Sequence, residues 1–169
     1  MAKFYSVGVG AGDGSYITLG ALRALEQADI IAVPVKKYGE KSTALEIIRK
    51  EFDTDKKEIS ELEFRMSGDT KIREESRRNS AEKIISALKD GKDVAMITLG
   101  DVSVYSTCTY VHNAVKNAGF ELEIIPGITS FCAAAARVDI SLCEEDVQKY
   151  LNRRKPGQSK YTTKRKEDD

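Results

Sequence analysis

The chain has 169 residues, enough for one domain with one hydrophobic core. Its 27 basic and 27 acidic residues leave a formal net charge of zero, so no overall field attracts nucleic acid or an anionic membrane. No segment has the roughly 20 apolar residues of a membrane span, and the N-terminus lacks a signal-peptide pattern. These features predict a cytoplasmic protein that binds neither nucleic acid nor membranes.

The three cysteines, Cys108, Cys132 and Cys143, favour neither a disulfide framework nor a metal site. Their number is odd, none belongs to a Cys-x-x-Cys pair, and the chain has a single histidine. We therefore expect reduced thiols, most of them in the core, and no metal bound by the protein.

Short apolar runs rich in β-branched residues alternate with helical patterns along most of the chain. Such alternation is typical of an α/β fold, with a mostly parallel sheet flanked by helices. The expected strands are residues 4–9, 30–33, 58–66, 94–99 and 121–125, and the expected helices are residues 18–28, 42–52, 69–88, 110–118 and an alanine-rich stretch that ends near residue 136. Pro34 is expected to end the second strand, because proline has no N–H to donate to a sheet.

Residues 145–169 differ in character from the part before them. They are polar, contain Pro156 and Gly157, and end in mixed charge, so they offer too little apolar surface for a core. We expect residues 1–144 to form the domain. Residues 145–169 are expected to be a polar tail, partly disordered, that arises from truncation or a frameshift.

Three loops follow the carboxyl ends of expected strands, at residues 10–15, 100–103 and 126–129. In a parallel sheet these ends share one edge, where open α/β folds bind ligands, so we expect the three loops to meet. The first loop is glycine-rich, VGVGAGDGSYIT, but counted from Gly8 or Gly10 its sixth position is not the glycine of a dinucleotide fingerprint. No Lys-Ser or Lys-Thr pair follows, so a triphosphate site is not predicted. Two readings remain: a backbone that a ligand approaches closely, or a tight turn without a ligand.

Polar side chains in the other two loops also leave alternatives open. Asp101 follows a buried strand, where it either accepts hydrogen bonds from a ligand or caps the next helix. Thr129 or Ser130, in the segment PGITS, is favoured as a helix cap.

Two further features are interpreted as structural rather than catalytic. His112 lies within a helical pattern with no cysteine or carboxylate at metal-ligand spacing, so we expect a surface or core histidine. The basic residues Lys71, Arg73, Arg77 and Arg78 alternate with glutamates, which is typical of a solvated helix face. In the alternative interpretation, the arginines of this segment pair with carboxylates of a substrate.

Three segments, in this order and spacing, resemble the tetrapyrrole methylase family, the S-adenosylmethionine (SAM)-dependent methyltransferases of cobalamin and sirohaem synthesis. They are VGVGAGDGSYITLGALRALEQADII at residues 7–31, MITLGDVSVYSTCTYV at residues 96–111, and IPGITSFCAAAA at residues 125–136. The second and third segments most resemble the family's enzymes that methylate carbon 20 of precorrin-2 or cobalt-precorrin-2. The resemblance covers about residues 3–144.

The resemblance implies a two-domain α/β enzyme, usually a homodimer, that binds a folded SAM in a cleft beside a tetrapyrrole substrate. Carried over by position, the cofactor contacts fall on Ala11, Leu99, Gly100, Asp101, Val104, Thr129 and Ser130. The glycine-rich loop would then shape the floor of the cleft and hold no phosphate. Related uroporphyrinogen methylases have an aspartate shortly after the second strand, but this chain reads AVPVKKYG there, so no catalytic residue is assigned.

The family's second domain supplies the other wall of the cleft, and we expect this chain to lack it. Weak SAM affinity and little turnover would follow. Two alternatives remain: another member of the superfamily, such as a neighbouring ring methylase or a diphthamide-synthesis methylase, or a non-catalytic dimerising module that retains the fold.

Overall fold

The computed structural model describes residues 2–143 of the chain. Residues 2–133 form one compact unit, and the described residues from Ala134 onwards belong to another. The sheet and every cavity considered below belong to the first unit. The expected tail, residues 145–169, lies outside the described residues, so its character and the domain boundary at residue 144 stay predictions. Among the described helices, none is long and apolar enough to cross a membrane.

Five parallel strands form the sheet, as the alternating sequence pattern predicts. The strands are β1 (Lys3–Gly8), β2 (Ile30–Val35), β3 (Glu58–Glu63), β4 (Val94–Thr98) and β5 (Glu121–Ile125). Their order across the sheet is β3-β2-β4-β1-β5, so β4 is central. All five residues of β4 are buried, because helices cover the sheet on both sides.

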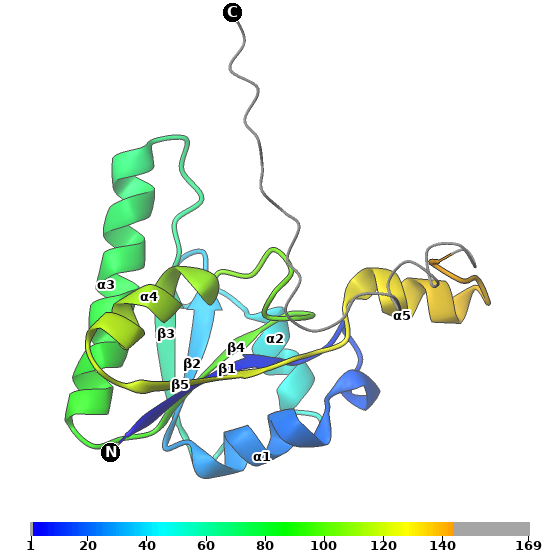
Figure 1. Ribbon diagram of the computed structural model, residues 1–169, viewed down its shortest axis with the longest axis horizontal. Coiled ribbons are helices and arrows are strands. Elements are labelled where there is room, and N and C mark those ends of the chain that lie inside the picture. The colour runs from blue at the N-terminus through cyan, green and yellow to red at the C-terminus, as the bar shows by residue number, and fades with distance from the viewer. Residues whose placement is uncertain (1, 144–169) are drawn as a thin grey trace, which may run out of the picture. The chain divides into compact units, whose positions relative to one another are not determined.

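Helices α1 and α2 cover one face of the sheet, and α3 and α4 cover the other (Figure 1). The helices are α1 (Leu19–Gln27), α2 (Thr43–Ile48), α3 (Thr70–Lys89), α4 (Thr109–Asn117) and α5 (Ser130–Arg137), with a short 3-10 helix at Gly14–Tyr16. Neighbouring strand residues point to opposite faces, so Phe4 joins the core beneath α3 and α4, whereas Tyr5 joins the core beneath α1 and α2. The predicted α/β class is confirmed.

Short polar side chains cap the helices that begin at the carboxyl edge of the sheet. Thr18 Oγ1 accepts a hydrogen bond from the N–H of Ala21 at 3.1 Å, so Thr18 caps α1. Thr129 Oγ1 accepts one from the N–H of Cys132 at 3.4 Å, in the first turn of α5. Each cap satisfies an N–H that has no partner within its helix, and it fixes where the preceding loop ends.

The second strand does not end at Pro34, as the sequence pattern predicts, but continues to Val35. The carbonyl of Val35 accepts a hydrogen bond from the N–H of Phe64 at 2.8 Å, on the β3 side. Because backbone groups of successive residues alternate in direction, the nitrogen of Pro34 faces the β4 side. Pairing with β4 has already ended at Ala32, so the missing N–H costs no hydrogen bond there.

The second helix is shorter than predicted. It ends at Ile48 rather than near Phe52, and the chain then continues in turns, in which the N–H of Phe52 donates to the carbonyl of Ile48 at 2.8 Å. Strand β3 is also shorter than predicted, ending at Glu63 instead of Met66, and it lies at one edge of the sheet.

The prediction that most cysteines lie in the core is wrong. Cys108, the residue directly before α4, is buried, whereas Cys132 is exposed and Cys143 is partly exposed; all three are free thiols. Cys132 lies on α5, most of whose residues are exposed in the structure. Alanine-rich spacing therefore does not establish that a helix is buried all round.

His112 is a core residue, one of the two structural roles expected. It is 9% exposed, and its Nε2 lies 3.0 Å from the hydroxyl of Ser6 on β1. The ring also meets Phe4 edge-on, with centroids 6.4 Å apart. Burial, aided by the nearby charge of Lys116, holds the pKa of His112 below its ordinary value.

The arginines of α3 contact the protein itself. The guanidinium of Arg73 donates to the carbonyls of Ser67 and Gly68, the latter at 3.0 Å, and so closes the loop before α3. That of Arg77 lies 3.6 Å from the ring centroid of Tyr110 on α4, a cation–π contact that joins the two helices. These contacts give both arginines a structural role.

Candidate functional site

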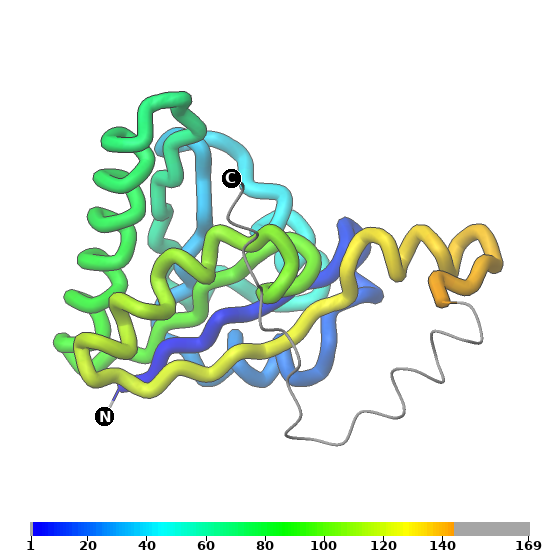
Figure 2. The backbone as a smooth tube through the Cα atoms, turned by 45° about the horizontal axis from the view of Figure 1, so that its top comes forward, coloured from blue at the N-terminus to red at the C-terminus, as the bar shows by residue number. Residues whose placement is uncertain are grey.

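The three glycine-containing loops predicted to meet do so at the carboxyl edge of the sheet. Gly10 and Gly100 exchange two backbone hydrogen bonds, with N···O distances of 3.1 and 2.8 Å, and form an isolated antiparallel bridge. The N–H of Gly127, in the third loop, donates to Asp101 at 2.8 Å. The end of the blue strand β1 and the yellow segment after β5 run side by side in both views (Figure 1, Figure 2).

Close packing of the loop backbones explains two of these glycines. A Cβ atom on Gly8 would lie 2.7 Å from the carbonyl oxygen of Gly100 and 2.7 Å from the nitrogen of Gly127. Side chains therefore do not fit where the loops touch. Gly8 and Gly127 serve contact between loops rather than contact with a ligand.

Gly12 is different, because it adopts φ +91° and its missing Cβ faces open space. Glycine is needed here for the backbone conformation, and the space beside it belongs to a cavity that a ligand is able to enter.

Asp101 holds two of the loops together. One carboxylate oxygen accepts the N–H of Ser103 at 2.8 Å and also the Ser103 hydroxyl, while the other accepts the N–H of Gly127 at 2.8 Å. Burial alone would raise the pKa of this carboxyl, which is 8% exposed, but these hydrogen bonds outweigh burial and lower it below the ordinary value. Asp101 is therefore ionised at neutral pH. It does not cap α4, which begins only at Thr109.

A cavity of about 490 Å³ lies between these loops. Its volume is within the range of about 300–1,000 Å³ typical of sites for small ligands. It is lined by Ala11, Gly12, Thr43, Thr98, Leu99, Gly100, Asp101, Val104, Tyr105, Thr107, Thr129 and Ser130. All seven residues that the resemblance assigned to the cofactor are among them. The structure thus brings together residues from three separate parts of the sequence.

Four cavity residues were not identified from the sequence: Thr43, Thr98, Tyr105 and Thr107. Thr43 opens α2, and the connection before it also leaves the carboxyl end of a strand, β2. That topology was a usable signal, since every such connection in a parallel sheet faces the same edge. Thr98, the last residue of β4, and Thr107 add hydroxyls to the wall. The position of Thr107 depends on the path of the loop after β4.

Tyr105 combines two unusual properties in the wall of this cavity. It adopts φ +50°, in the left-handed region that side-chain-bearing residues rarely occupy, and its side chain is fully exposed. Strained backbone of this kind clusters at ligand sites. The aromatic ring stands free at the rim, able to contact a bound ligand.

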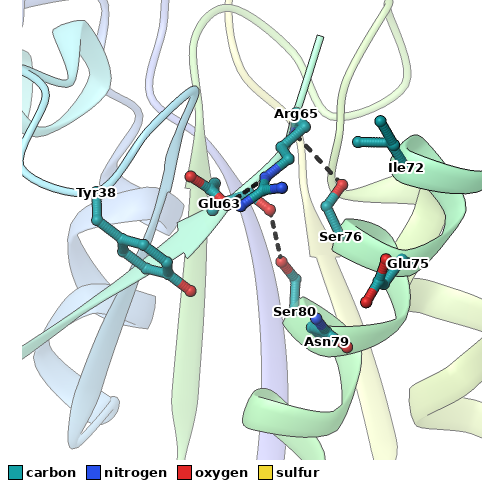
Figure 3. A pocket seen from close by; sticks show the side chains of 8 residues that line it. All are labelled: Tyr38, Glu63, Arg65, Ile72, Glu75, Ser76, Asn79 and Ser80. Atoms are coloured by element: carbon teal, nitrogen blue, oxygen red, sulfur yellow. Dashed lines mark hydrogen bonds and ion pairs between the residues drawn. The ribbon is translucent and has the colours of Figure 1, made fainter. Parts of the chain in front are cut away.

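A smaller and more polar cavity, of about 190 Å³, lies between β3 and α3 (Figure 3). Arg65 Nε donates to the carboxylate of Glu63 at 2.8 Å, and the N–H of Arg65 donates to the Ser76 hydroxyl at 3.3 Å. Ser80 donates to the carbonyl of Glu63 at 3.2 Å. These polar groups satisfy one another, so the larger cavity is the better candidate for the ligand site. Among the described residues, no group of side chains is placed to hold a metal ion.

The fold and the cavity together define a parallel α/β domain with a cavity of small-ligand size at the carboxyl edge of its sheet. Residues 3–168 match the family model described as Tetrapyrrole (Corrin/Porphyrin) Methylases, and the chain belongs to this family.

Individual relatives agree with this membership. The chain is 46% identical over 144 residues to a probable cobalt-precorrin-2 C(20)-methyltransferase of Methanocaldococcus jannaschii, a match covering 85% of this chain and 60% of that protein. It is 34% identical over 143 residues to the cobalt-precorrin-2 C(20)-methyltransferase of Salmonella typhimurium, again covering 85% and 60%. The solved structure of cobalt precorrin-4 methyltransferase CbiF is similar with a TM-score of 0.61 and 26% identity, over 85% of this chain and 53% of that one. The chain thus spans about 60% of the length of the curated relatives it matches.

Proposed function

We propose that this chain is the SAM-binding domain of a methyltransferase that acts on carbon 20 of precorrin-2, in its cobalt-containing form. One observation carries the proposal: the seven residues that match the family's cofactor contacts line a single cavity. The names of the two relatives described above support the choice of carbon 20 and of the cobalt-containing substrate.

The chemistry of the cavity suits SAM. Its lining combines loop backbone, apolar side chains, the ring of Tyr105 and several threonine and serine hydroxyls, groups that suit an uncharged adenosine and an amino-acid moiety. Among the residues that the structure describes, no lysine or arginine lines it, and the ionised carboxylate of Asp101 is the formal charge in the wall at neutral pH. A negative charge favours a ligand that carries a sulfonium and an ammonium group.

Bound SAM would supply a sulfonium methyl group. A macrocycle carbon would form a bond to this methyl carbon while the sulfur–methyl bond breaks with its electron pair staying on sulfur, and the proton of the methylated carbon would pass to water. The role of this chain's residues is alignment, which is the main contribution that such a displacement requires. Asp101 keeps the loops after β4 and β5 at a fixed separation, and Gly12 leaves room at the wall. We assign no catalytic base.

We further propose a homodimer located in the cytoplasm, as in the family the chain resembles. β5 is an edge strand whose Ile124 is 49% exposed, and Phe131 in the first turn of α5 is 51% exposed. Apolar side chains of this size on an open edge suit an interface. Light scattering coupled to size-exclusion chromatography measures the mass directly, and a monomer at tens of micromolar protein would contradict the dimer.

Isothermal titration calorimetry with SAM and with S-adenosylhomocysteine tests the cofactor proposal. We expect dissociation constants in the micromolar range, about −8 kcal/mol of binding free energy. Asp101→Ala should weaken both, whereas Asp55→Ala, at an exposed loop position, should weaken neither. A folded wild-type chain that binds neither compound contradicts the proposal, and a stable dimer without binding would favour a non-catalytic module.

A further inference from the structure

We propose that Lys36, Lys37 and Lys41, here called the lysine shelf, bind peripheral carboxylates of the macrocycle beside the SAM cavity. The inference rests on the proposed function and deepens it, because it names the residues that select a polycarboxylate substrate. Three observations support the proposal. The hollows along the sheet edge adjoin one another, the loop after β2 is fixed to the sheet by hydrogen bonds, and that loop carries an excess of positive charge.

The lysine shelf is joined to the SAM cavity by shared walls. A hollow of about 340 Å³ shares Thr43, Thr98 and Leu99 with the SAM cavity and adds Lys36 and Lys41. A further hollow of about 520 Å³ shares Lys36 with it and adds Lys37. These hollows follow the carboxyl ends of β4, β2 and β3 in the order of the strands, so one large ligand is able to extend from the methyl donor to the lysines.

The loop that presents two of the lysines is fixed to the sheet. Lys36 and Lys37 come directly after β2, and the N–H of Gly39 donates to the carboxylate of Glu61 on β3 at 2.8 Å. The ammonium of Lys83 lies 5.8 Å from the ring centroid of Tyr38 and donates to the carbonyl of Glu61 at 2.9 Å. A held loop keeps the lysines in place before the ligand arrives, which reduces the entropy lost on binding.

The charges on this stretch are unbalanced in favour of an anion. Arg65 also lines the outer hollow, but its guanidinium is already paired with Glu63 (Figure 3). Within residues 2–143, the structure shows no ion pair of the lysine shelf with an acidic side chain. Glu40 is the acidic side chain that faces the intermediate hollow. Three ammonium groups against the carboxylates of Glu40 and Glu61 leave a net positive charge that suits a ligand with several carboxylates, and the lysines lie outside the SAM cavity.

The lysines are exposed, so each contact with a carboxylate is weak and screened by salt. The affinity they provide therefore depends on how many lysines take part. Replacing all three should weaken the binding of a polycarboxylate by about tenfold at low ionic strength. The same replacement should leave SAM binding unchanged, because none of the three lines that cavity.

The test compares two triple variants of the full chain. One is Lys36→Gln, Lys37→Gln and Lys41→Gln. The matched control is Lys50→Gln, Lys89→Gln and Lys116→Gln, three exposed lysines at or just beyond the carboxyl ends of α2, α3 and α4, towards the opposite edge of the sheet. Porphyrin fluorescence reports binding of uroporphyrin, with eight carboxylates, and of coproporphyrin, with four. Calorimetry with S-adenosylhomocysteine is run on every protein.

We expect the wild type and the control variant to bind uroporphyrin more tightly than coproporphyrin, and the shelf variant to lose about tenfold in uroporphyrin affinity and most of that preference. Inorganic phosphate at equal ionic strength should not compete more than chloride, since a competing phosphate would indicate a phosphate site instead. Unchanged uroporphyrin affinity in the shelf variant, or no uroporphyrin binding by the wild type, overturns the inference. A wild-type chain that does not bind S-adenosylhomocysteine would instead overturn the proposed function.

Discussion

The carboxylate of Asp101 and the backbone N–H of Gly127 are 2.8 Å apart, and their hydrogen bond ties the loop after β4 to the loop after β5. The same carboxylate also accepts two hydrogen bonds from Ser103. Asp101 thus shapes the cavity in addition to lining it. A ligand contact and a structural contact are compatible here, because a carboxylate has about four acceptor positions.

Asp101→Ala should lower both stability and ligand affinity. It leaves the N–H groups of Ser103 and Gly127 without their partner, so we expect the free energy of unfolding to fall by about 1–3 kcal/mol. SAM affinity should fall as the two loops separate. Urea denaturation measures the first effect and calorimetry the second. Asp55→Ala should change stability by less than about 0.5 kcal/mol, and an equal effect of both variants would remove the special role of Asp101.

Stability should also depend on acid through Asp101. Its pKa in the folded chain is below the ordinary 3.8, so its contribution is complete above that value and is lost as pH falls through the folded pKa. Urea denaturation at pH 7 and at pH 3 should therefore show a smaller loss for Asp101→Asn than for the wild type. Equal losses in both proteins would show that the pKa of Asp101 is not lowered by folding.

Gly8→Ala should separate the loops by steric clash alone. Its Cβ would lie 2.7 Å from two backbone atoms that cannot rotate away, so we expect a loss of about 1–3 kcal/mol and weaker SAM binding. Gly68→Ala is the matched control, because its Cβ meets nothing within 4 Å. Thermal and urea unfolding of both variants measure the change in stability. A Gly8→Ala protein as stable as Gly68→Ala would contradict the close packing described for the three loops.

Tyr105 allows stability and binding to be separated. Tyr105→Gly relieves the left-handed backbone but makes the unfolded chain more flexible, so stability should change by less than about 1 kcal/mol. SAM affinity should nevertheless fall several-fold, because the ring at the cavity rim is lost. Tyr105→Phe keeps the ring and should bind like the wild type. If Tyr105→Gly binds SAM with unchanged affinity, the ring makes no contact with the ligand.

His112 is the chain's one histidine, which makes its titration simple to observe. Its folded pKa is below the ordinary 6.5, so the unfolded chain takes up the proton first and stability falls as pH drops below that value. Between about pH 7.5 and 5.5, His112→Gln should show less of this decline than the wild type. Urea denaturation across this range provides the measurement. Identical pH profiles would contradict the burial of the imidazole in the folded state.

The sequence was sufficient for the fold because each element carried its own local signal. The buried run of β4 and the capping positions Thr18 and Thr129 predict where strands and helices begin. Parallel topology then places the loops after β1, β4 and β5 at one edge, which is how Ala11, Asp101 and Thr129 come to line the same cavity.

The features that the sequence analysis predicted incorrectly or missed depend on interactions between distant segments. Pro34 continues β2 because pairing with β4 has already stopped, a fact of register rather than of local pattern. Tyr105 and Thr107 reach the cavity through the path of the loop after Asp101, which no periodicity encodes. The exposure of Cys132 follows from which side of α5 is covered, and that depends on the tertiary structure.

A crystal structure of the chain with S-adenosylhomocysteine tests the central claim most directly, since the claim is that three loops distant in sequence form one cofactor site. We expect the ligand in the cavity beside Gly12, Asp101 and Thr129, with the Asp101–Gly127 hydrogen bond intact. A ligand bound on another face of the domain, with this cavity unoccupied, would contradict it.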